Sequence, residues 1–187
     1  TEEKGVDKTQ KLLIMKEKEK STVFAQPVDK YLKTIPAQYV ARFIVNRQYR
    51  NWEVGVDSTS MADTLIQKCN QSLYLIPRKV VDEADGFCWD SPQKGRNLYV
   101  CDMSSNRGMR DGTFLFISRK ALRQLQANGS FVYNGILWRK ISADEKSITI
   151  KAEQDGTVMQ IAVNLGLPWV LRMDGNPLGI DWRLEKQ

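Results

Sequence analysis

The apolar residues in the first part of the chain fall mainly at helical spacings. Residues 1–20 are rich in Lys and Glu and contain few apolar positions, a pattern typical of an exposed helix or arm. Pro36 suits the first turn of a further helix, and Tyr39 and Phe43, four residues apart, share one helical face. The pattern therefore predicts an amphipathic helix over residues 36–50.

A second pattern that predicts the start of a helix lies at Ser60 and Asp63. A side-chain acceptor followed three residues later by an acid is a variant of the capping box, and it predicts a helix from about residue 61 to residue 70. Short apolar runs at residues 52–56 and 73–76 predict strands on either side of this helix.

The second half of the chain consists of short apolar runs separated by turn residues, which predicts a series of strands. Asn134-Gly135 predicts a tight hairpin between two of these runs, and Asp155-Gly156 predicts another. The runs lie at residues 98–101, 113–117, 131–133, 136–138, 147–150 and 158–163.

One short helix interrupts these strands, because Ala121 and Leu125 share a helical face and Gly129 follows as a stop. The predicted fold class is therefore α+β, with a helical N-terminal region followed by a β-rich C-terminal domain. Residues 1–35 would form a charged helical arm or linker, residues 36–96 a mixed helical and strand region, and residues 97–187 the β-rich domain.

Composition excludes several classes of function. The 187 residues contain no histidine, which excludes Ser-His-Asp and Cys-His catalysis and histidine metal sites. No glycine-rich phosphate-binding motif occurs, so we expect no nucleotide or other small-molecule cofactor. The acids at residues 82–85 have the pattern of a solvated loop, so we also expect no metal site.

The cysteines and the hydropathy indicate a compartment. Cys69, Cys88 and Cys101 form no zinc-ribbon pair, and their odd number leaves a free thiol, which fits a reducing compartment. No apolar stretch is long enough to cross a bilayer, which predicts no membrane span. We therefore expect a cytoplasmic protein.

The charge distribution indicates an anionic partner. The net charge is +6, and two windows of the sequence hold basic residues with few acids. Because arginine and lysine contact phosphates, we expect both windows to bind DNA; the alternative is a solvated surface. The first window contains Arg42, Arg47 and Arg50, and the second contains Arg107, Arg110, Arg119, Lys120 and Arg123.

The C-terminal region also carries an ordered series of motifs. A D-M-S-S turn at residues 102–105 precedes R-D-G at residues 110–112, and the hairpin at Asn134-Gly135 precedes R-K at residues 139–140. This order resembles the C-terminal domain of LexA and CI-type phage repressors, the S24 peptidase-like fold, over residues 97–187. In that family the turn presents a nucleophilic serine, and a later hairpin strand presents the lysine that activates it. The resemblance implies that Ser104 holds the serine position, that Arg139 holds the lysine position with Lys140 beside it, and that the domain self-associates.

The residue at the base position decides the expected activity. A serine–lysine dyad requires a lysine that can lose its proton, whereas arginine keeps its charge even when it is buried. With Arg139 at that position the dyad is inactive, and only a one-residue shift in register would bring Lys140 to Ser104. Self-cleavage by Ser104 and Lys140 is thus the activity that the sequence disfavours least, and we expect no catalysis.

We therefore expect a non-catalytic, regulatory DNA-binding protein of phage or mobile-element type, which self-associates through its S24-like domain. The alternative is a structural or interaction component of a secretion, conjugation or phage-assembly system that binds no nucleic acid.

Overall fold

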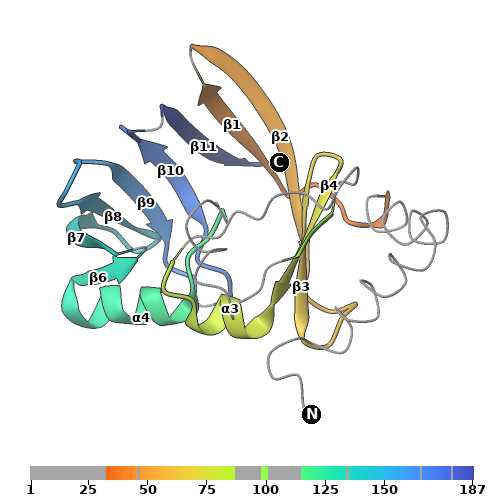
Figure 1. Cartoon of the computed structure of the whole chain (residues 1–187), viewed down its shortest axis with the longest axis horizontal. Helices are drawn as coiled ribbons and strands as arrows, with labels where there is room; N and C mark the ends of the chain where they lie inside the picture. The colour runs from red at the N-terminus through yellow and green to blue at the C-terminus, as the bar shows by residue number, and fades with distance from the viewer. Residues whose placement is uncertain are drawn as a thin grey trace.

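The structure is a computed structural model, which describes residues 33–45, 47–86, 98–100, 115–133, 135–164, 166–177 and 179–187. Its main element is one 11-stranded sheet with the strand order β5-β4-β3-β2-β1-β11-β10-β9-β8-β7-β6 (Figure 1). Neighbouring strands are antiparallel except β4 and β5, which are parallel.

The strands are β1 (Tyr39–Val45), β2 (Gln48–Asp57), β3 (Thr64–Cys69), β4 (Ser72–Pro77), β5 (Leu98–Val100), β6 (Ser130–Tyr133), β7 (Ile136–Ala143), β8 (Ser147–Ala152), β9 (Val158–Ala162), β10 (Val170–Asp174) and β11 (Ile180–Lys186). The helices are α3 (Arg78–Glu83) and α4 (Arg119–Asn128).

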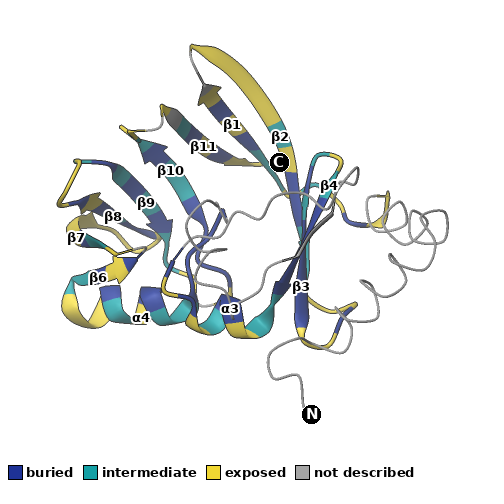
Figure 2. Ribbon diagram, viewed as in Figure 1, coloured by how far each residue is buried: buried dark blue, intermediate teal, exposed yellow. Residues whose placement is uncertain are grey.

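The first and last described strands lie side by side in the middle of the sheet. β1 pairs with β2 on one side and with β11 on the other, and this register places Phe43 opposite Trp182. Both residues are buried on the face of the sheet that we call the inner face. One buried apolar cluster joins this face to Val80 of α3 and Leu122 of α4. The two helices therefore close the same core, as the dark buried positions in Figure 2 show.

Most of the strands predicted in the second half of the chain are confirmed. β6 and β7 form the hairpin predicted from Asn134-Gly135, and β8 and β9 form the one predicted from Asp155-Gly156. Strands also contain the runs predicted at 52–56 and 73–76. Of the run at 113–117, the described part forms a single β-bridge, between Phe116 and Trp169.

The short helix predicted in this half is also confirmed, as α4. Ser118 caps its start, because the Ser118 hydroxyl accepts a hydrogen bond from the Ala121 N–H at 3.1 Å. Gly129 ends it with φ 69, a left-handed conformation that glycine adopts without steric cost. Cap, apolar face and stop all lie within this short stretch, which is why the sequence alone predicts it.

The predicted helical N-terminal region, and with it the α+β class, is contradicted. The described residues are mainly antiparallel sheet, and residues 36–50 contain β1 and the start of β2 in place of a helix. Tyr39 and Phe43 are four residues apart, but four is also a multiple of the two-residue repeat of a strand. Ala41 between them is fully buried, which shows that the two-residue repeat applies.

The helix predicted over residues 61–70 is wrong as well, because residues 64–69 form β3. The turn before β3 is organised by Asp57, whose carboxylate accepts hydrogen bonds from the N–H groups of Thr59 at 2.9 Å and Ser60 at 3.0 Å. β3 is buried along nearly its whole length, so its residues show no alternation that would mark a strand.

The charged arm predicted for residues 1–35 lies outside the described residues up to residue 32. The single sheet contains strands from the predicted 36–96 region and from the predicted 97–187 domain. Within the described part of the chain, no helix is both long enough and apolar enough to cross a membrane.

Candidate functional site

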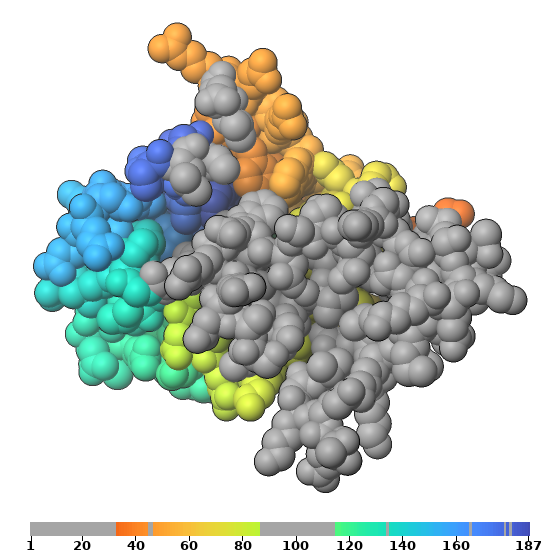
Figure 3. All heavy atoms as spheres, in the orientation of Figure 1, coloured from red at the N-terminus to blue at the C-terminus, as the bar shows by residue number. Residues whose placement is uncertain are grey.

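The β1–β2 hairpin forms the upper corner of the sheet in Figures 1 and 3, and β11 pairs along the whole length of β1. Its outer part consists of exposed residues on both faces, since all four positions from Gln48 to Asn51 are exposed. β2 begins to pair with β3 only at Val54, so residues 48–52 have no strand beside them in the described structure apart from β1. We call Ile44, Arg47, Tyr49 and Arg50 the hairpin tip.

The side chains of the tip stand on two faces. Tyr49 lies directly opposite Ile44 on the outer face, and the exposed fractions of these side chains are 78% and 36%. Arg50 lies opposite Phe43, and therefore on the inner side of the ribbon. Below it, the rings of Phe43 and Trp52 pack with centroids 4.5 Å apart, which anchors the hairpin to the core.

The turn at the tip has a costly backbone conformation. Two residues connect β1 to β2, and the second of them, Arg47, has φ 62. A side chain other than Gly, Asn or Asp costs roughly 1–2 kcal/mol in this left-handed region. The β3–β4 turn provides a comparison, because its left-handed residue is Asn70 (φ 52), whose side chain accepts a hydrogen bond from the Glu53 N–H at 2.8 Å. Arg47 forms no hydrogen bond or ion pair with any described residue.

The tip carries positive charge, and the acid that the sheet pairing places beside it is Asp181 of β11, opposite Ile44. The sequence from Gln38 to Trp52 contains three arginines and no acid. Of these, Arg42 forms an ion pair with Glu185 of β11 at 3.1 Å. Arg50, like Arg47, is exposed and has no ion pair within the described residues. The first predicted basic window is therefore divided between the two faces of the sheet, and Arg47 and Arg50 form no ion pair with a described residue.

The sheet adds two arginines that the sequence analysis missed. Arg42 of β1 lies opposite Arg183 of β11, which lies opposite Arg172 of β10. These three residues form an arginine row on the outer face, the face that carries Tyr49. Arg172 and Arg183 both lie near Asp174, at 2.9 and 3.9 Å, so the acids offset most of the charge of the row.

No local signal in the sequence predicts the arginine row. More than a hundred residues separate Arg42 from its two neighbours, and only the pairing of β1 with β11 brings them together.

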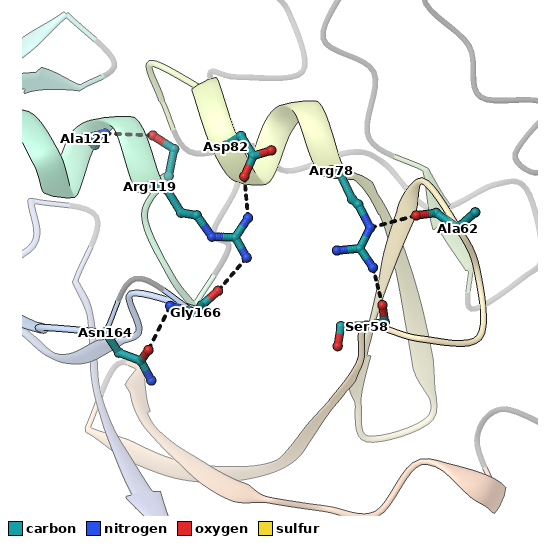
Figure 4. A network of polar contacts seen from close by, with 9 residues as sticks. Ser58, Ala62, Arg78, Asp82, Arg119, Ala121, Asn164 and Gly166 are labelled. Carbon is teal, nitrogen blue, oxygen red and sulfur yellow. Dashed lines mark hydrogen bonds and ion pairs between the residues drawn. The ribbon is translucent and has the colours of Figure 1, made fainter.

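Of the second basic window, the structure describes Arg119, Lys120 and Arg123, and the first two form contacts within the fold, with Arg119 shown in Figure 4. The Arg119 guanidinium donates hydrogen bonds to the carboxylate of Asp82 and, at 2.7 Å, to the carbonyl oxygen of Gly166. Lys120 pairs with Asp85 at 3.0 Å. These contacts tie α4 to α3 and to the loop between β9 and β10, a role that requires no ligand.

Neighbouring contacts extend the same network. The Ser118 hydroxyl donates to the Ala84 carbonyl oxygen at 2.7 Å, and Arg78 of α3 donates to the carbonyl oxygens of Ala62, at 2.8 Å, and Ser58. Arg123 is exposed on α4 and forms no ion pair with a described residue. α4 and the hairpin tip lie on opposite sides of the molecule in Figure 1, so the structure does not bring Arg119, Lys120 and Arg123 to the first window.

The residues of the predicted dyad are described only in part. Ser104, Arg107 and Arg110 lie outside the described residues. Arg139 is exposed on β7 and pairs with Glu153 at 3.5 Å. Lys140 is also exposed, so its amine lacks the burial that a lysine base requires. The S24-like arrangement stays a prediction.

Other chemistry finds little support in the described residues. They contain no group of three or more cysteine and acidic side chains placed to hold a metal ion. Burial raises the pKa of the Cys69 thiol to about 12, against a smaller lowering by the Gln67 side chain, so this cysteine is not a nucleophile near neutral pH. No protein-family model, curated protein or solved structure matches the chain.

Proposed function

We propose that this protein binds nucleic acid, with DNA as the expected form, through the hairpin tip and without catalysing a reaction on it. One observation carries the proposal: Arg47 and Arg50 are exposed in a stretch, residues 38–52, that contains no acid, next to an exposed Tyr49. Arginine makes charge-assisted hydrogen bonds to phosphate oxygens, and these bonds supply the expected affinity for nucleic acid.

The regulatory, repressor-like role belongs to the same proposal. Self-association through residues 97–187 would present two hairpin tips to one DNA molecule. The two tips would then bind more tightly than either alone, because the second contact becomes intramolecular. Support for this part comes only from the resemblance in the sequence.

Two double variants with equal loss of charge test the site. Arg47→Ala with Arg50→Ala removes the free charge of the tip, whereas Lys120→Ala with Arg123→Ala removes two basic residues from α4. We expect the tip variant to weaken binding of a labelled DNA duplex by about 2- to 30-fold at low salt, from roughly 0.2–1 kcal/mol for each exposed charge. It should also reduce the slope of log affinity against log salt by about 2.

The α4 variant provides the control, and it should leave both quantities nearly unchanged. Equal losses from the two variants would show binding to charge anywhere on the surface and would reject the hairpin tip as the site. An unmodified protein that binds no DNA even at low salt would reject the function itself.

The alternative from the sequence, an interaction module without nucleic acid, also has an observation in its favour. Tyr49 and Ile44 form an exposed apolar pair, and residues 48–52 leave one edge of β2 open for another protein strand. Analytical ultracentrifugation with and without DNA separates the two proposals. Self-assembly or partner assembly that ignores DNA would favour the interaction module.

A further inference from the structure

We infer that the hairpin tip binds single-stranded nucleic acid, with one base stacked on the ring of Tyr49 and the flanking phosphates held by Arg47 and Arg50. This inference rests on the proposed function and specifies its ligand. The argument has three parts, which concern the aromatic ring, the backbone at Arg47 and the geometry of competing ligands.

Tyr49 differs from the other tyrosines whose burial is described. Tyr74 and Tyr133 are buried in the core, and Tyr39 packs against Trp169 with ring centroids 4.8 Å apart. Tyr49 leaves 78% of its surface exposed and contributes no ring contact among the described residues. Its cross-strand neighbour Ile44 covers part of one side, which leaves a flat ring with an open face. An exposed ring beside cations is the arrangement that single-strand binders use to stack bases.

Arg47 occupies a turn position whose backbone conformation favours another residue type. Position 47 has a left-handed backbone, which glycine or asparagine adopts at lower cost. Arg47 forms no hydrogen bond or ion pair with a described residue. Within the described part of the fold, no such interaction offsets the cost of the left-handed backbone. Arg47 lies in the two-residue turn between β1 and β2, two residues before Tyr49 and three before Arg50 in the sequence. Backbone strain without an internal benefit is a feature of ligand sites.

The geometry favours a single strand over a duplex. Bases in a duplex are stacked on each other and offer only their edges, so a duplex would engage the arginines and leave the Tyr49 ring unused. An unpaired base presents its whole face, and a flexible backbone can place phosphates on both sides of the ribbon. Arg50 and Tyr49 point to opposite faces, which suits a strand that wraps over the tip.

An acidic peptide fits the same surface less well. A strand added to the open edge of β2 would lie in the plane of the sheet, whereas the Tyr49 ring stands on its face. Carboxylates would meet the arginines but would offer no flat surface to the ring. A peptide partner therefore explains the charge of the tip and leaves Tyr49 without a function.

Binding by fluorescence anisotropy tests the inference. The probes are a labelled oligothymidylate about 20 nucleotides long, which exceeds a typical single-strand site, and a labelled duplex of the same length, with poly-glutamate as competitor. We expect the single strand to bind more tightly than the duplex. Tyr49→Ala should weaken single-strand binding by about 5- to 100-fold and leave duplex binding nearly unchanged. Tyr49→Phe should retain the affinity, because it keeps the ring.

Val132→Ala is the matched control, since Val132 is a 54% exposed apolar residue on β6, at the far end of the sheet order. It should bind like the parent protein. Equal affinity for duplex and single strand, with no effect of Tyr49→Ala, would overturn the stacking inference and leave nucleic-acid binding intact. Poly-glutamate that competes as well as unlabelled oligothymidylate would overturn it in favour of an acidic peptide. Failure to bind either nucleic acid at low salt would overturn the proposed function too.

Arg47→Gly supplies a second, independent measurement. This substitution removes the guanidinium and the left-handed strain together, so the thermal midpoint should stay equal or rise while single-strand affinity falls. A lower midpoint with unchanged affinity would show that Arg47 serves the fold, and would remove it from the site.

Discussion

Replacing Arg119 separates a role in the fold from a role in binding. Arg119 is the first residue of α4, and its guanidinium joins Asp82 of α3 to the Gly166 carbonyl in the β9–β10 loop (Figure 4). The sequence places this arginine in a basic window and predicts that it binds DNA. Arg119→Met keeps an unbranched apolar stem and a good helix former, and it removes the hydrogen bonds to Asp82 and Gly166.

The expected loss of stability follows from the exposure of the two partners. The side chain of Arg119 is 23% exposed and that of Asp82 is 48% exposed, so solvent screens their ion pair to about 0.5–1 kcal/mol. The bond to the Gly166 carbonyl, at 2.7 Å, contributes about 0.5–1.5 kcal/mol. We therefore expect a total of about 1–2.5 kcal/mol, which corresponds to a fall in the thermal midpoint of roughly 2–10 °C for a chain of this size.

The measurement is thermal and urea unfolding followed by circular dichroism, with a double-mutant cycle that adds Asp82→Ala. The cycle should give a coupling of about 0.5–1 kcal/mol, since Asp82 supplies only one of the two bonds. Arg123→Ala, on the exposed side of the same helix, should change stability little. A fully stable Arg119→Met protein would refute the structural role. A folded Arg119→Met protein that loses nucleic-acid binding as severely as the tip variant would show that Arg119 also belongs to the interface.

Three further predictions concern the fold around the site. Gly55→Ala should lower the free energy of unfolding by about 1–3 kcal/mol in urea titrations, because an added Cβ would lie 2.2 Å from the Pro36 carbonyl oxygen; an unchanged value would contradict this close approach. Burial tends to raise the pKa of Asp57, but hydrogen bonds from Ser60 and Thr59 outweigh it and hold the pKa of the folded protein below 3.8. The ionised Asp57 carboxylate therefore stabilises the fold at pH values above 3.8. This contribution is lost as the pH falls through the lower pKa of the folded state. Asp57→Asn should therefore flatten the acid limb of the stability–pH curve, and an identical limb would refute it. Cys69 should resist alkylation by iodoacetamide at pH 8 until urea unfolds the protein, as peptide mapping would show, because burial raises its pKa to about 12.

How well the sequence predicts each element depends on where the stabilising contacts lie. The helix at α4 has its cap, its apolar face and its stop within a dozen consecutive residues, and the β6–β7 hairpin has its turn between its own strands. In both cases the local pattern contains the whole physical cause. β1 and β3 lie between strands on either side, so their residues are selected by packing against distant neighbours. The helical spacing of Tyr39 and Phe43 could not reveal that packing.

The candidate surface depends on distant pairing in the same way. The sequence identifies Arg42, Arg47 and Arg50 as a group because a hairpin keeps sequence neighbours close in space. It misses Arg172 and Arg183, which reach Arg42 only through the pairing of the last strands with the first. Tyr49 carries no charge, and nothing short of its exposure distinguishes it from a core aromatic residue.

The two basic windows differ in a way that bears on charge analysis in general. Arg119 meets an acid 37 residues earlier in the chain, and Lys120 meets one 35 residues earlier, so the lack of acids near them in sequence says nothing about their surroundings in space. The tip lies in a hairpin whose two strands are consecutive, so residues near it in the sequence are also near it in space, and β11 adds Asp181 opposite Ile44. A stretch of sequence without acids is therefore better evidence for an anion site in a hairpin, where neighbours in sequence pair with each other, than in a helix that packs against distant segments. By that criterion Arg47 and Arg50 remain candidates for phosphate contacts, and Arg119 and Lys120 are explained by the fold.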